Sequence, residues 1–187
     1  LRLLWLGREF GRGGHSRVEP QSLLRQDVQS RGRGALERRR HMFEVPVDVV
    51  CDDSMIPTYA HEGDAGADMR AAIKEPVTIQ PGKSEWVGTG VRVEIPHGHV
   101  GLQFPRSGLG CKHGICLANG TGVIDSGYRG EVRAKLLNLG AEPFTVNPGD
   151  RICQLVIVPY TKAKFWTVKE LGESDRGTDG YGSTGVE

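Results

Sequence analysis

Five short stretches of this 187-residue sequence carry residue types suited to moving protons and holding anions. They combine aspartate, which can take a proton from water, with arginine, serine and glycine, whose side chains and backbone N–H groups can hold negative charge. The stretches are 64–68, 105–110, 122–131, 147–154 and 176–185. Taken singly, each could be a solvated turn, because glycine and aspartate are also common turn residues. Whether these stretches form a functional site therefore has to be judged from their order and spacing together.

The last stretch, RGTDGYGSTG at 176–185, matches two phosphate-binding patterns only on the surface. A G-x-G-x-x-G pattern begins at Gly180, but it needs a following helix to receive a pyrophosphate, and two residues remain. P-loop spacing begins at Gly177, but Ser183 stands where that loop needs its lysine. We reject both patterns. Composition alone then predicts a frayed tail.

The cysteines raise the question of a metal or a disulfide framework. The sequence contains four: Cys51, Cys111, Cys116 and Cys153. Cys111, His113 and Cys116 lie close enough to suggest zinc, but the second ligand pair that a structural zinc site needs is missing. We therefore expect reduced thiols and a cytoplasmic protein, with the nucleus as the alternative in a eukaryote.

The elements that must position these residues read as β-strands. Three runs show this best: in 86–96 and 131–137 apolar residues alternate with charged ones, and 152–158 is nearly all apolar. The first two predict strands with one buried face, and the third predicts a strand buried on both faces.

Turn signals separate the strand runs. Pro followed by Gly at 81–82 and at 148–149 suits type II turns, and 96–99 predicts another turn. Sustained helical periodicity is missing, so we expect one short helix within 107–117. The sequence predicts a single all-β domain of roughly ten short strands, a sandwich, barrel or jelly roll.

The net charge of +1 conceals a division of the chain near residue 41. Residues 1–41 hold ten arginines, no lysine and four acidic residues, whereas residues 42–187 hold 14 basic and 19 acidic residues. We interpret 1–41 as a disordered basic extension, upstream or non-native, with Met42 as the natural start. A transit peptide and a nucleic-acid-binding arm are the less favoured alternatives. No apolar run reaches the ~18–20 residues of a membrane span, so we expect neither membrane nor nucleic acid as a partner.

Taken in order, the five stretches closely resemble the five motifs of the trimeric deoxyuridine triphosphatases, over 45–185. The resemblance implies a jelly-roll-like (β-clip) domain over 42–175, a flexible C-terminal lid over 176–187, and a homotrimer whose active sites draw residues from all three chains. It implies hydrolysis of dUTP to dUMP and pyrophosphate with Mg²⁺, which limits uracil in DNA and supplies dUMP for thymidylate synthesis.

The resemblance gives the third motif the roles of base and of sugar and uracil recognition. Asp125 matches the aspartate that activates the attacking water and contacts the 3′-hydroxyl. Tyr128 matches the tyrosine that packs against deoxyribose and excludes a 2′-hydroxyl. The hairpin from Asn119 to Asp125 matches the element that receives uracil, with Asn119 on the base edge. Its remaining substrate-binding positions are Gly122, Val123 and Ile124.

The first, second and fourth motifs correspond to the phosphate side. Arg106, Ser107 and Gly108 match the phosphate-binding positions near the scissile bridge, and Gln154 matches a glutamine close to the phosphates. Asp68 matches the aspartate that organises the site, through water on magnesium. The resemblance implies no direct metal ligand in the protein, because Mg²⁺ favours an octahedral oxygen shell that three phosphates and water can supply.

The fifth motif corresponds to the lid. Arg176 matches a catalytic arginine that meets phosphate charge, Tyr181 would stack on uracil, and Gly182, Ser183 and Thr184 would supply donors around the γ-phosphate. Three positions depart from the family pattern: Tyr181 replaces the usual phenylalanine, and Thr178 and Asp179 occupy positions commonly held by a small or acidic residue and then glycine. Asp179 adds negative charge near a triphosphate and would weaken closure.

Two other functions fit parts of the pattern. A dCTP deaminase shares the fold and some phosphate-binding residues, but the uracil-binding segment and the terminal motif favour the hydrolase. A catalytically inactive nucleotide-binding module would keep the fold without the chemistry, and the presence of Asp125, Arg106 and Arg176 argues against it.

Overall fold

The computed structural model describes residues 44–178. Contacts divide the chain into Leu1–Val45 and Pro46–Glu187, and the fold below is that of the second unit. The predicted boundaries near 42 and 176 stay predictions. Within the described range the elements are β1 (Asp48–Val50), a 3₁₀ turn η1 (Asp53–Met55), β2 (Ala67–Arg70), β3 (Val77–Ile79), β4 (Ser84–Val87), β5 (Arg92–Glu94), β6 (His99–Pro105), α2 (Ser107–His113), β7 (Ile115–Leu117), β8 (Gly122–Ile124), β9 (Ala134–Asn138), β10 (Phe144–Val146) and β11 (Arg151–Pro159).

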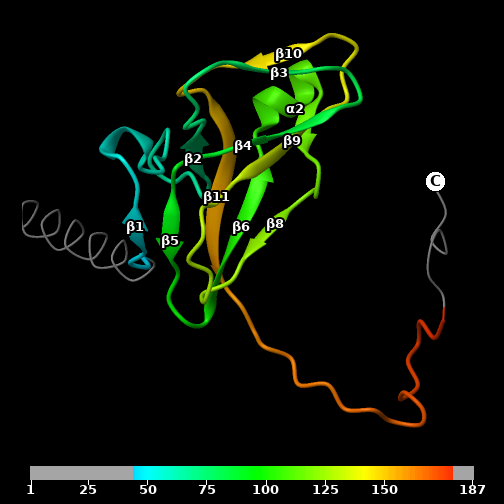
Figure 1. Ribbon diagram of the computed structural model, residues 1–187. Coiled ribbons are helices and arrows are strands. Elements are labelled where there is room, and N and C mark those ends of the chain that lie inside the picture. The colour runs from blue at the N-terminus through cyan, green and yellow to red at the C-terminus, as the bar shows by residue number, and fades with distance from the viewer. Residues whose placement is uncertain (1–43, 179–187) are drawn as a thin grey trace, which may run out of the picture. The chain divides into compact units, whose positions relative to one another are not determined.

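These strands form small antiparallel sheets (Figure 1). One has the order β2-β11-β6-β8 and another β4-β9-β7, while β1 pairs with β5 and β10 with β3. The longest strand, β11, lies between β2 and β6 and therefore joins the first motif to the second. The predicted all-β domain with one short helix is confirmed, and the helix lies within the predicted stretch.

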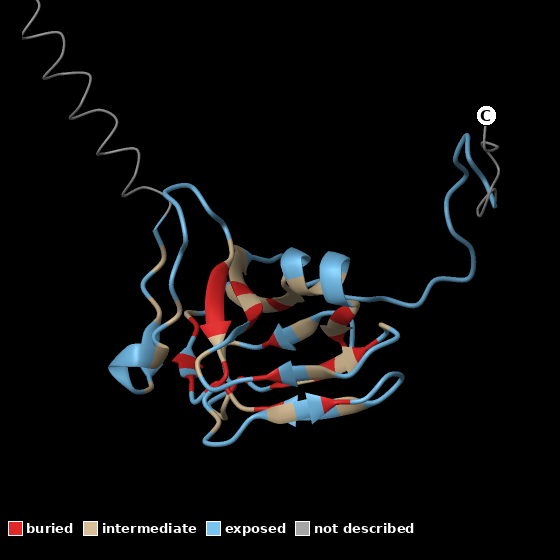
Figure 2. Ribbon diagram, turned by 90° about the horizontal axis from the view of Figure 1, so that it is seen from above, coloured by how far each residue is buried: buried red, intermediate tan, exposed pale blue. Residues whose placement is uncertain are grey.

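The core is made by the inward residues of these strands. Its largest fully buried side chains include Met69, Ile79, Ile95, Ile115 and Leu136. Figure 2 shows buried and exposed positions alternating along the strands, which is the pattern of sheets with one face on the core. The predicted burial of Val91, Val93 and Ile95, and of Val132, Ala134 and Leu136, is confirmed.

Three strand predictions need correction. The run 131–137 becomes a strand only in its second part, because β9 begins at Ala134. The run 86–96 is split, because β4 ends at Val87 and β5 begins at Arg92, with Gly90 between them at a positive φ of 68°. The run 152–158 is buried on both faces only in its first part. Ile152, Cys153 and Leu155 are buried, whereas Val156, Ile157 and Val158 are only half-buried.

The three predicted turns are present. The N–H of Lys83 donates to Gln80, that of Asp150 to Asn147 and that of His99 to Pro96, at 3.0, 3.1 and 3.2 Å. Their glycines, at 82, 149 and 98, have φ of 71°, 81° and 84°. Glycine is required there because other residues rarely adopt that conformation.

The segment expected to form a hairpin is instead a crossover. β7 pairs with β9 in one sheet, whereas β8 pairs with β6 in another, so Asn119–Asp125 carries the chain between sheets. The turn itself is tight, with the N–H of Gly120 donating to the carbonyl of Leu117 at 3.0 Å and Gly120 at φ 70°. Sequence periodicity locates strands well but does not say which strand pairs with which.

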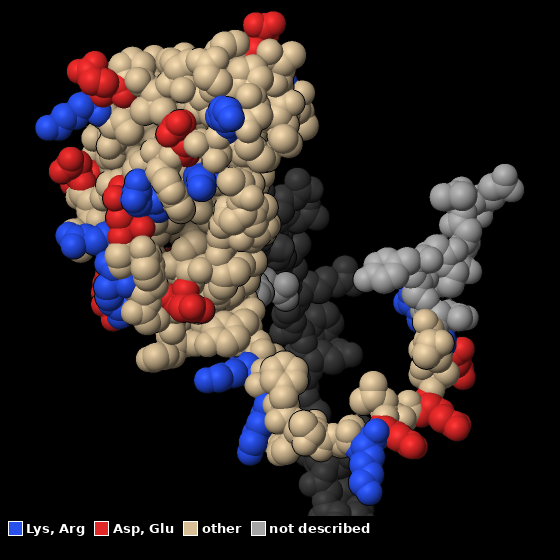
Figure 3. Space-filling model, turned by 45° about the vertical axis from the view of Figure 1, so that its right-hand side comes forward, with Lys and Arg blue, Asp and Glu red and all other residues tan. Residues whose placement is uncertain are grey.

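After β11 the chain runs on as an exposed arm, defined here as residues 160–178. It contains large apolar side chains that the chain itself leaves uncovered: Phe165 is 90% exposed, Trp166 73% and Leu171 89%. On the face of the molecule seen in Figure 3, acidic and basic side chains are interspersed. None of the helices within 44–178 has the length and apolar content to cross a membrane.

Candidate active site

A buried carboxylate organises one side of the candidate site. Asp68 is 3% exposed, and its two oxygens accept hydrogen bonds from three side chains. Arg106 donates from Nε at 2.8 Å and from Nη2 at 3.4 Å, Arg151 from Nη1 at 3.1 Å and Gln154 from Nε2 at 3.1 Å. These four donors match the roughly four acceptor sites of a carboxylate. Burial of this charge is tolerable because it is fully paired.

Strand pairing explains how residues so far apart in sequence meet. On one side of β2, the N–H of Asp68 donates to the carbonyl of Thr58 at 2.8 Å, and on the other side β11 sets Gln154 opposite Asp68. The next strand, β6, ends one residue before Arg106, which occupies the N-cap position of α2. The backbone therefore holds Asp68 between its partners before any side chain is considered.

A bulge in β11 lets Arg151 and Gln154 reach the same carboxylate. Side chains three apart in a regular strand point to opposite faces. The pairing of β11 with β2 shifts register between Arg151 and Cys153, and a bulge of this kind turns the following side chains to the other face. Two consecutive buried residues, Ile152 and Cys153, mark the same irregularity.

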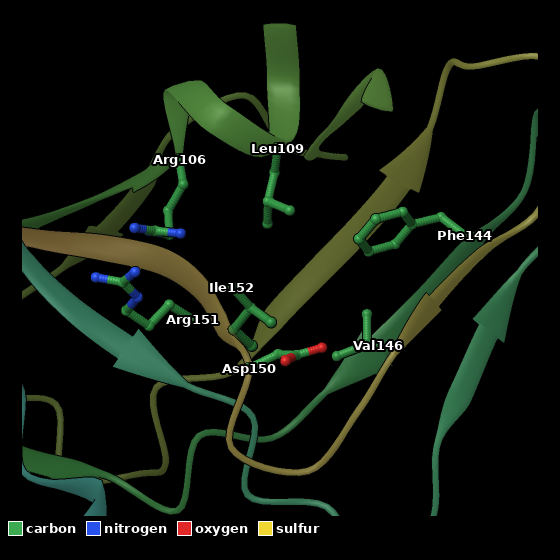
Figure 4. Close-up of a pocket in the computed structure, with 7 residues that line it drawn as sticks. All are labelled: Arg106, Leu109, Phe144, Val146, Asp150, Arg151 and Ile152. Atoms are coloured by element: carbon green, nitrogen blue, oxygen red, sulfur yellow. The ribbon is translucent and has the colours of Figure 1, made fainter. Parts of the chain in front are cut away.

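A cavity of about 260 Å³ lies beside this cluster. Its lining residues are Arg106, Leu109, Phe144, Val146, Asp150, Arg151 and Ile152. Figure 4 shows the two arginines next to each other on one side and the apolar side chains gathered on the other. Ser107 and Gly108, which open α2, are exposed, and a Cβ on Gly108 would meet no atom within 4 Å. The start of the helix is thus open to a ligand.

The predicted base lies on a different part of the surface. Asp125 is exposed and directly follows β8. Its carbonyl accepts a hydrogen bond from the N–H of Tyr128 at 3.0 Å, and the Tyr128 hydroxyl donates to the carbonyl of Glu131 at 3.0 Å. Gly130 is required here, because a Cβ would overlap the Tyr128 ring. Tyr128 is still 45% exposed, so a ligand can reach it.

The predicted uracil-binding segment precedes Asp125. Asn119 is exposed, and its side-chain amide donates to the carbonyl of Thr121 at a long 3.4 Å. A Cβ on Gly122 would lie 2.8 Å from Oε1 of Gln103, so a larger residue here would require the Gln103 side chain to shift. Val123 is 65% exposed, whereas Ile124 is buried and anchors the segment to the core.

One chain does not bring the two sets of residues together. Asp68 lies on β2 and Asp125 follows β8, at opposite edges of the four-stranded sheet. Asp68 is level with Phe104 of β6, whereas Ile124 is level with Gly101, so the two carboxylates also lie at different ends of the strands. Strand spacing and residue rise put them on the order of 20 Å apart. Within one chain, the two carboxylates therefore lie in separate parts of the sheet.

Most of the fifth motif lies outside the described residues. This holds for the departure at Asp179 and for the predicted ligand-binding positions Tyr181, Gly182, Ser183 and Thr184. Arg176, Gly177 and Thr178 are described and exposed, with the N–H of Gly177 donating to the Ser174 carbonyl at 3.0 Å.

Arg151 has no role in the sequence-based prediction, although its guanidinium contacts Asp68. The only sequence signal is a charged residue at the first position of a mostly apolar strand. A charged residue at the start of a strand can point into solvent as easily as into a site. Without knowledge of the bulge, it is therefore weak evidence for a role at the site.

The cysteines are free thiols in different surroundings. Cys153, next to the Asp68 cluster, is fully buried, and burial raises the pKa of its thiol to about 11; a hydrogen bond from Gln103 lowers the pKa and the charge of Asp68 raises it. Cys111 is exposed. Burial and the nearby Asp52 and Asp53 also raise the pKa of Cys51. Within the described residues no group of three or more His, Cys, Asp or Glu could hold a metal.

Comparison with known proteins gives a family match over most of the chain. The dUTPase family model matches residues 52–185. A deoxyuridine 5′-triphosphate nucleotidohydrolase of Desulfitobacterium hafniense is 48% identical over 132 residues, covering 70% of this chain and 87% of that protein. One from Neisseria gonorrhoeae is 49% identical over 140 residues, covering 73% and 93%.

Solved structures agree with the match. The dUTPase of Staphylococcus bacteriophage 80alpha, solved with dUPNHPP, has a TM-score of 0.69 at 30% identity and covers 75% of this chain and 99% of its own. A mutant dUTPase of the S. aureus phage phi11, described as showing coordination of a structural Mg(II) ion, has a TM-score of 0.61 at 28% identity, covering 68% and 99%.

Proposed function

Because the chain belongs to the dUTPase family, it hydrolyses dUTP to dUMP and pyrophosphate, and we propose that Asp125 is the general base of this reaction. Asp125 is exposed, and among residues 44–178 no side chain or N–H donates to its carboxylate. It is therefore available to accept a proton from water, as a general base must be.

The proposed reaction is a single displacement at the α-phosphorus. Asp125 takes a proton from a water molecule while the water oxygen bonds to the α-phosphorus. The bond from that phosphorus to the bridging oxygen breaks, and pyrophosphate leaves with the negative charge. Arg106, Gln154 and Arg176 would stabilise this charge, because fixed donors aimed at developing charge lower the barrier most.

One observation carries the assignment of the phosphate side. Arg106 and Gln154 share buried Asp68, which accepts hydrogen bonds from both at 2.8 and 3.1 Å. Their remaining donors are thus oriented before a ligand arrives, and preorganised donors do not have to be reordered during the reaction. Arg151, which completes the set, would place a second positive charge beside Asp68.

We expect Mg²⁺ to enter with the triphosphate. The described residues fit this role: arginine and amide donors suit phosphate oxygens, and all four acceptor sites of Asp68 are taken by protein donors. The predicted contact of Asp68 with the ion through water stays a prediction. Bound magnesium would neutralise charge on the phosphoryl oxygens.

Specificity for deoxyuridine would come from the segment before and after Asp125. Tyr128 keeps one ring face open for deoxyribose, where a 2′-hydroxyl would clash. Asn119 would face the uracil edge, and Gly122, Val123 and Ile124 would present backbone groups beside it. On the open start of α2, Ser107 and Gly108 would meet the phosphates.

We further propose a homotrimer with shared sites. The separation of Asp125 from Arg106 within one chain requires a second copy, and the uncovered apolar side chains of the arm offer surface for one. We also propose a cytoplasmic location, since the relatives named above are bacterial and the four cysteines are free.

The activity is tested by incubating the protein with dUTP and Mg²⁺ and measuring dUMP and pyrophosphate. We expect both products in equal amounts, and no ammonia from dCTP. Binding of dUTP without turnover would support an inactive module instead, and deamination of dCTP would support the deaminase.

Sharing of sites is tested by subunit mixing. Asp125→Asn chains are refolded together with chains that end at Asp175, each strongly impaired alone. If one site takes Asp125 and the terminal segment from different copies, equal mixing restores about a quarter of the sites. No restored activity would place both groups in the same chain.

A further inference from the structure

The turn that carries Asp125 and Tyr128 has little core packing to hold it. From Asp125 to Arg129 every residue is exposed or half-buried, and the turn contains no aliphatic side chain. A proton-transferring carboxylate must nevertheless be held in a defined direction, because a shift of about 1 Å can cost 100-fold in rate. Polar contacts must therefore hold the turn.

Arg129 supplies these contacts from within the turn. Its Nη1 donates to the carbonyl of Ser126 at 2.7 Å and to that of Tyr128 at 2.9 Å. Its Nη2 pairs with Oε1 of Glu94 at 2.7 Å. One planar guanidinium thus joins two backbone carbonyls of the turn to a carboxylate on a strand distant in sequence. A rigid fork of donors suits this geometry, whereas a lysine ammonium would not reach all three acceptors at once.

The strand that carries Glu94 is fixed on both sides of it. Val93 and Ile95 are 3% and 2% exposed, so Glu94 must point outward between two core residues. β5 also pairs with β1, where Glu94 lies opposite Asp48. Behind the turn, the N–H of Val132 donates to the carbonyl of Val91 at 2.8 Å. The backbone at Glu94 is thus held in place, and its carboxylate gives Arg129 a positioned partner.

We propose that Arg129, held by Glu94, is a positioning residue that sets the direction of Asp125 and of the Tyr128 ring. The proposal rests on the role given above to Asp125. Arg129 acts on the backbone: the Tyr128 carbonyl that it binds belongs to the residue whose N–H closes the turn onto Asp125. Loosening the guanidinium lets the carboxylate and the ring drift together. Turnover and discrimination against ribose therefore depend on the same contact.

The main test replaces Arg129 by methionine, which keeps most of the length of the side chain and removes every donor. We expect kcat for dUTP to fall about 10- to 100-fold with little change in KM, and the preference for dUTP over UTP to fall with it. The melting temperature should change little, because the guanidinium is 51% exposed and exposed ion pairs contribute little stability. Arg129→Lys should recover part of kcat, since one donor group remains.

Variants of Glu94 provide a second test. If Arg129 served folding alone, the effect of Glu94→Gln on kcat would not depend on Arg129. Glu94→Gln weakens the pairing and should lower kcat about two- to threefold in the wild-type background. In the Arg129→Met background the same change should have no effect, because the carboxylate acts only through the guanidinium. Arg92→Ala, an exposed arginine on the same strand, is the matched control and should behave as wild type.

Three results would overturn the proposal: unchanged kcat and unchanged dUTP preference in Arg129→Met, a loss of kcat that parallels a loss of melting temperature, or equal effects of Glu94→Gln in both backgrounds. These results are distinguishable from failure of the proposed function. If Asp125 is not the base, Asp125→Asn stays active whatever Arg129 does.

Discussion

The carboxylates of Asp68 and Asp125 differ sharply in solvent exposure. Asp68 is 3% exposed and accepts hydrogen bonds from three side chains, whereas the exposed carboxylate of Asp125 accepts none from the residues that the structure describes. The first is a structural charge, and its loss should be felt in folding. The second is the proposed general base, and its loss should be felt only in turnover. In the proposed reaction, the Asp68 cluster orients the phosphate-binding groups, while Asp125 reacts in a site completed by another copy.

The largest effect should follow from changing the exposed carboxylate, Asp125. Asp125→Asn keeps the size of the side chain and removes its basicity, so we expect turnover to fall about 1,000-fold, within the range of general-base catalysis. Binding of a non-hydrolysable dUTP analogue and the melting temperature should stay close to wild type. Pyrophosphate release and calorimetry measure the two halves of this expectation. Normal turnover would remove Asp125 from the role of base.

Removing the terminal segment should have the next largest effect. A chain ending at Asp175 lacks Arg176 and the predicted lid but keeps every strand of the described fold. We expect unchanged circular dichroism and turnover lower by about 100-fold, as for loss of one charge-stabilising donor. Gly172→Ala, which alters the exposed arm without shortening it, is the matched control. Full activity of the shortened chain would contradict the lid.

Changing the buried carboxylate, Asp68, should lower the stability of the fold. Asp68→Asn leaves Arg106 and Arg151 without their counter-charge, and breaking a buried pair typically costs about 3–5 kcal/mol. We expect about 2–3 kcal/mol in urea unfolding, because the two arginines are 24% and 43% exposed and water can solvate them in part. KM for dUTP should rise, since Arg106 loses its orientation. A variant as stable as wild type would show that the cluster is not what holds β2 against β11.

Alkaline pH should have an effect on stability no larger than that of Asp68→Asn, through the Cys153 thiol behind that cluster. The pKa of Cys153 is raised to about 11 by burial, above its ordinary value of 9.0, so the folded state keeps a proton that the unfolded state loses. Stability is therefore full below pH 9 and falls as pH rises toward 11, by about 2–3 kcal/mol. Urea titrations at about pH 8 and pH 10.5 measure it. Cys153→Ala should flatten the dependence, and an equal slope in that variant would assign it to other groups.

Local sequence patterns were enough to predict much of this structure. Alternation predicted the burial of Val93 and Ile95, and Pro-Gly pairs predicted turns that the structure contains at Gly82 and Gly149. The five motifs pointed to the dUTPase family, which the comparisons confirm. These features depend on a few neighbouring residues, so one sequence contains the information.

Other features depend on contacts between distant residues and were not predicted. The crossover between β7 and β8 depends on which strands pair, and that is settled by packing of the whole domain. The ion pair between Arg129 and Glu94 follows from the position of β5 beside the turn. The hydrogen bond from Arg151 to Asp68 follows from the bulge in β11. Neither leaves a periodic signal. The roles given to Asn119 and Gln154 remain predictions.

The bulge in β11 also constrains how this gene can change. Because Arg151 and Gln154 reach one carboxylate only through the register shift between Arg151 and Cys153, the number of residues in this stretch matters as much as their identity. Loss of a single codon here would turn Gln154 to the opposite face of the sheet and carry an apolar neighbour into its place. Insertions and deletions should therefore accumulate in open turns such as 60–64, whereas 151–154 should vary by substitution alone.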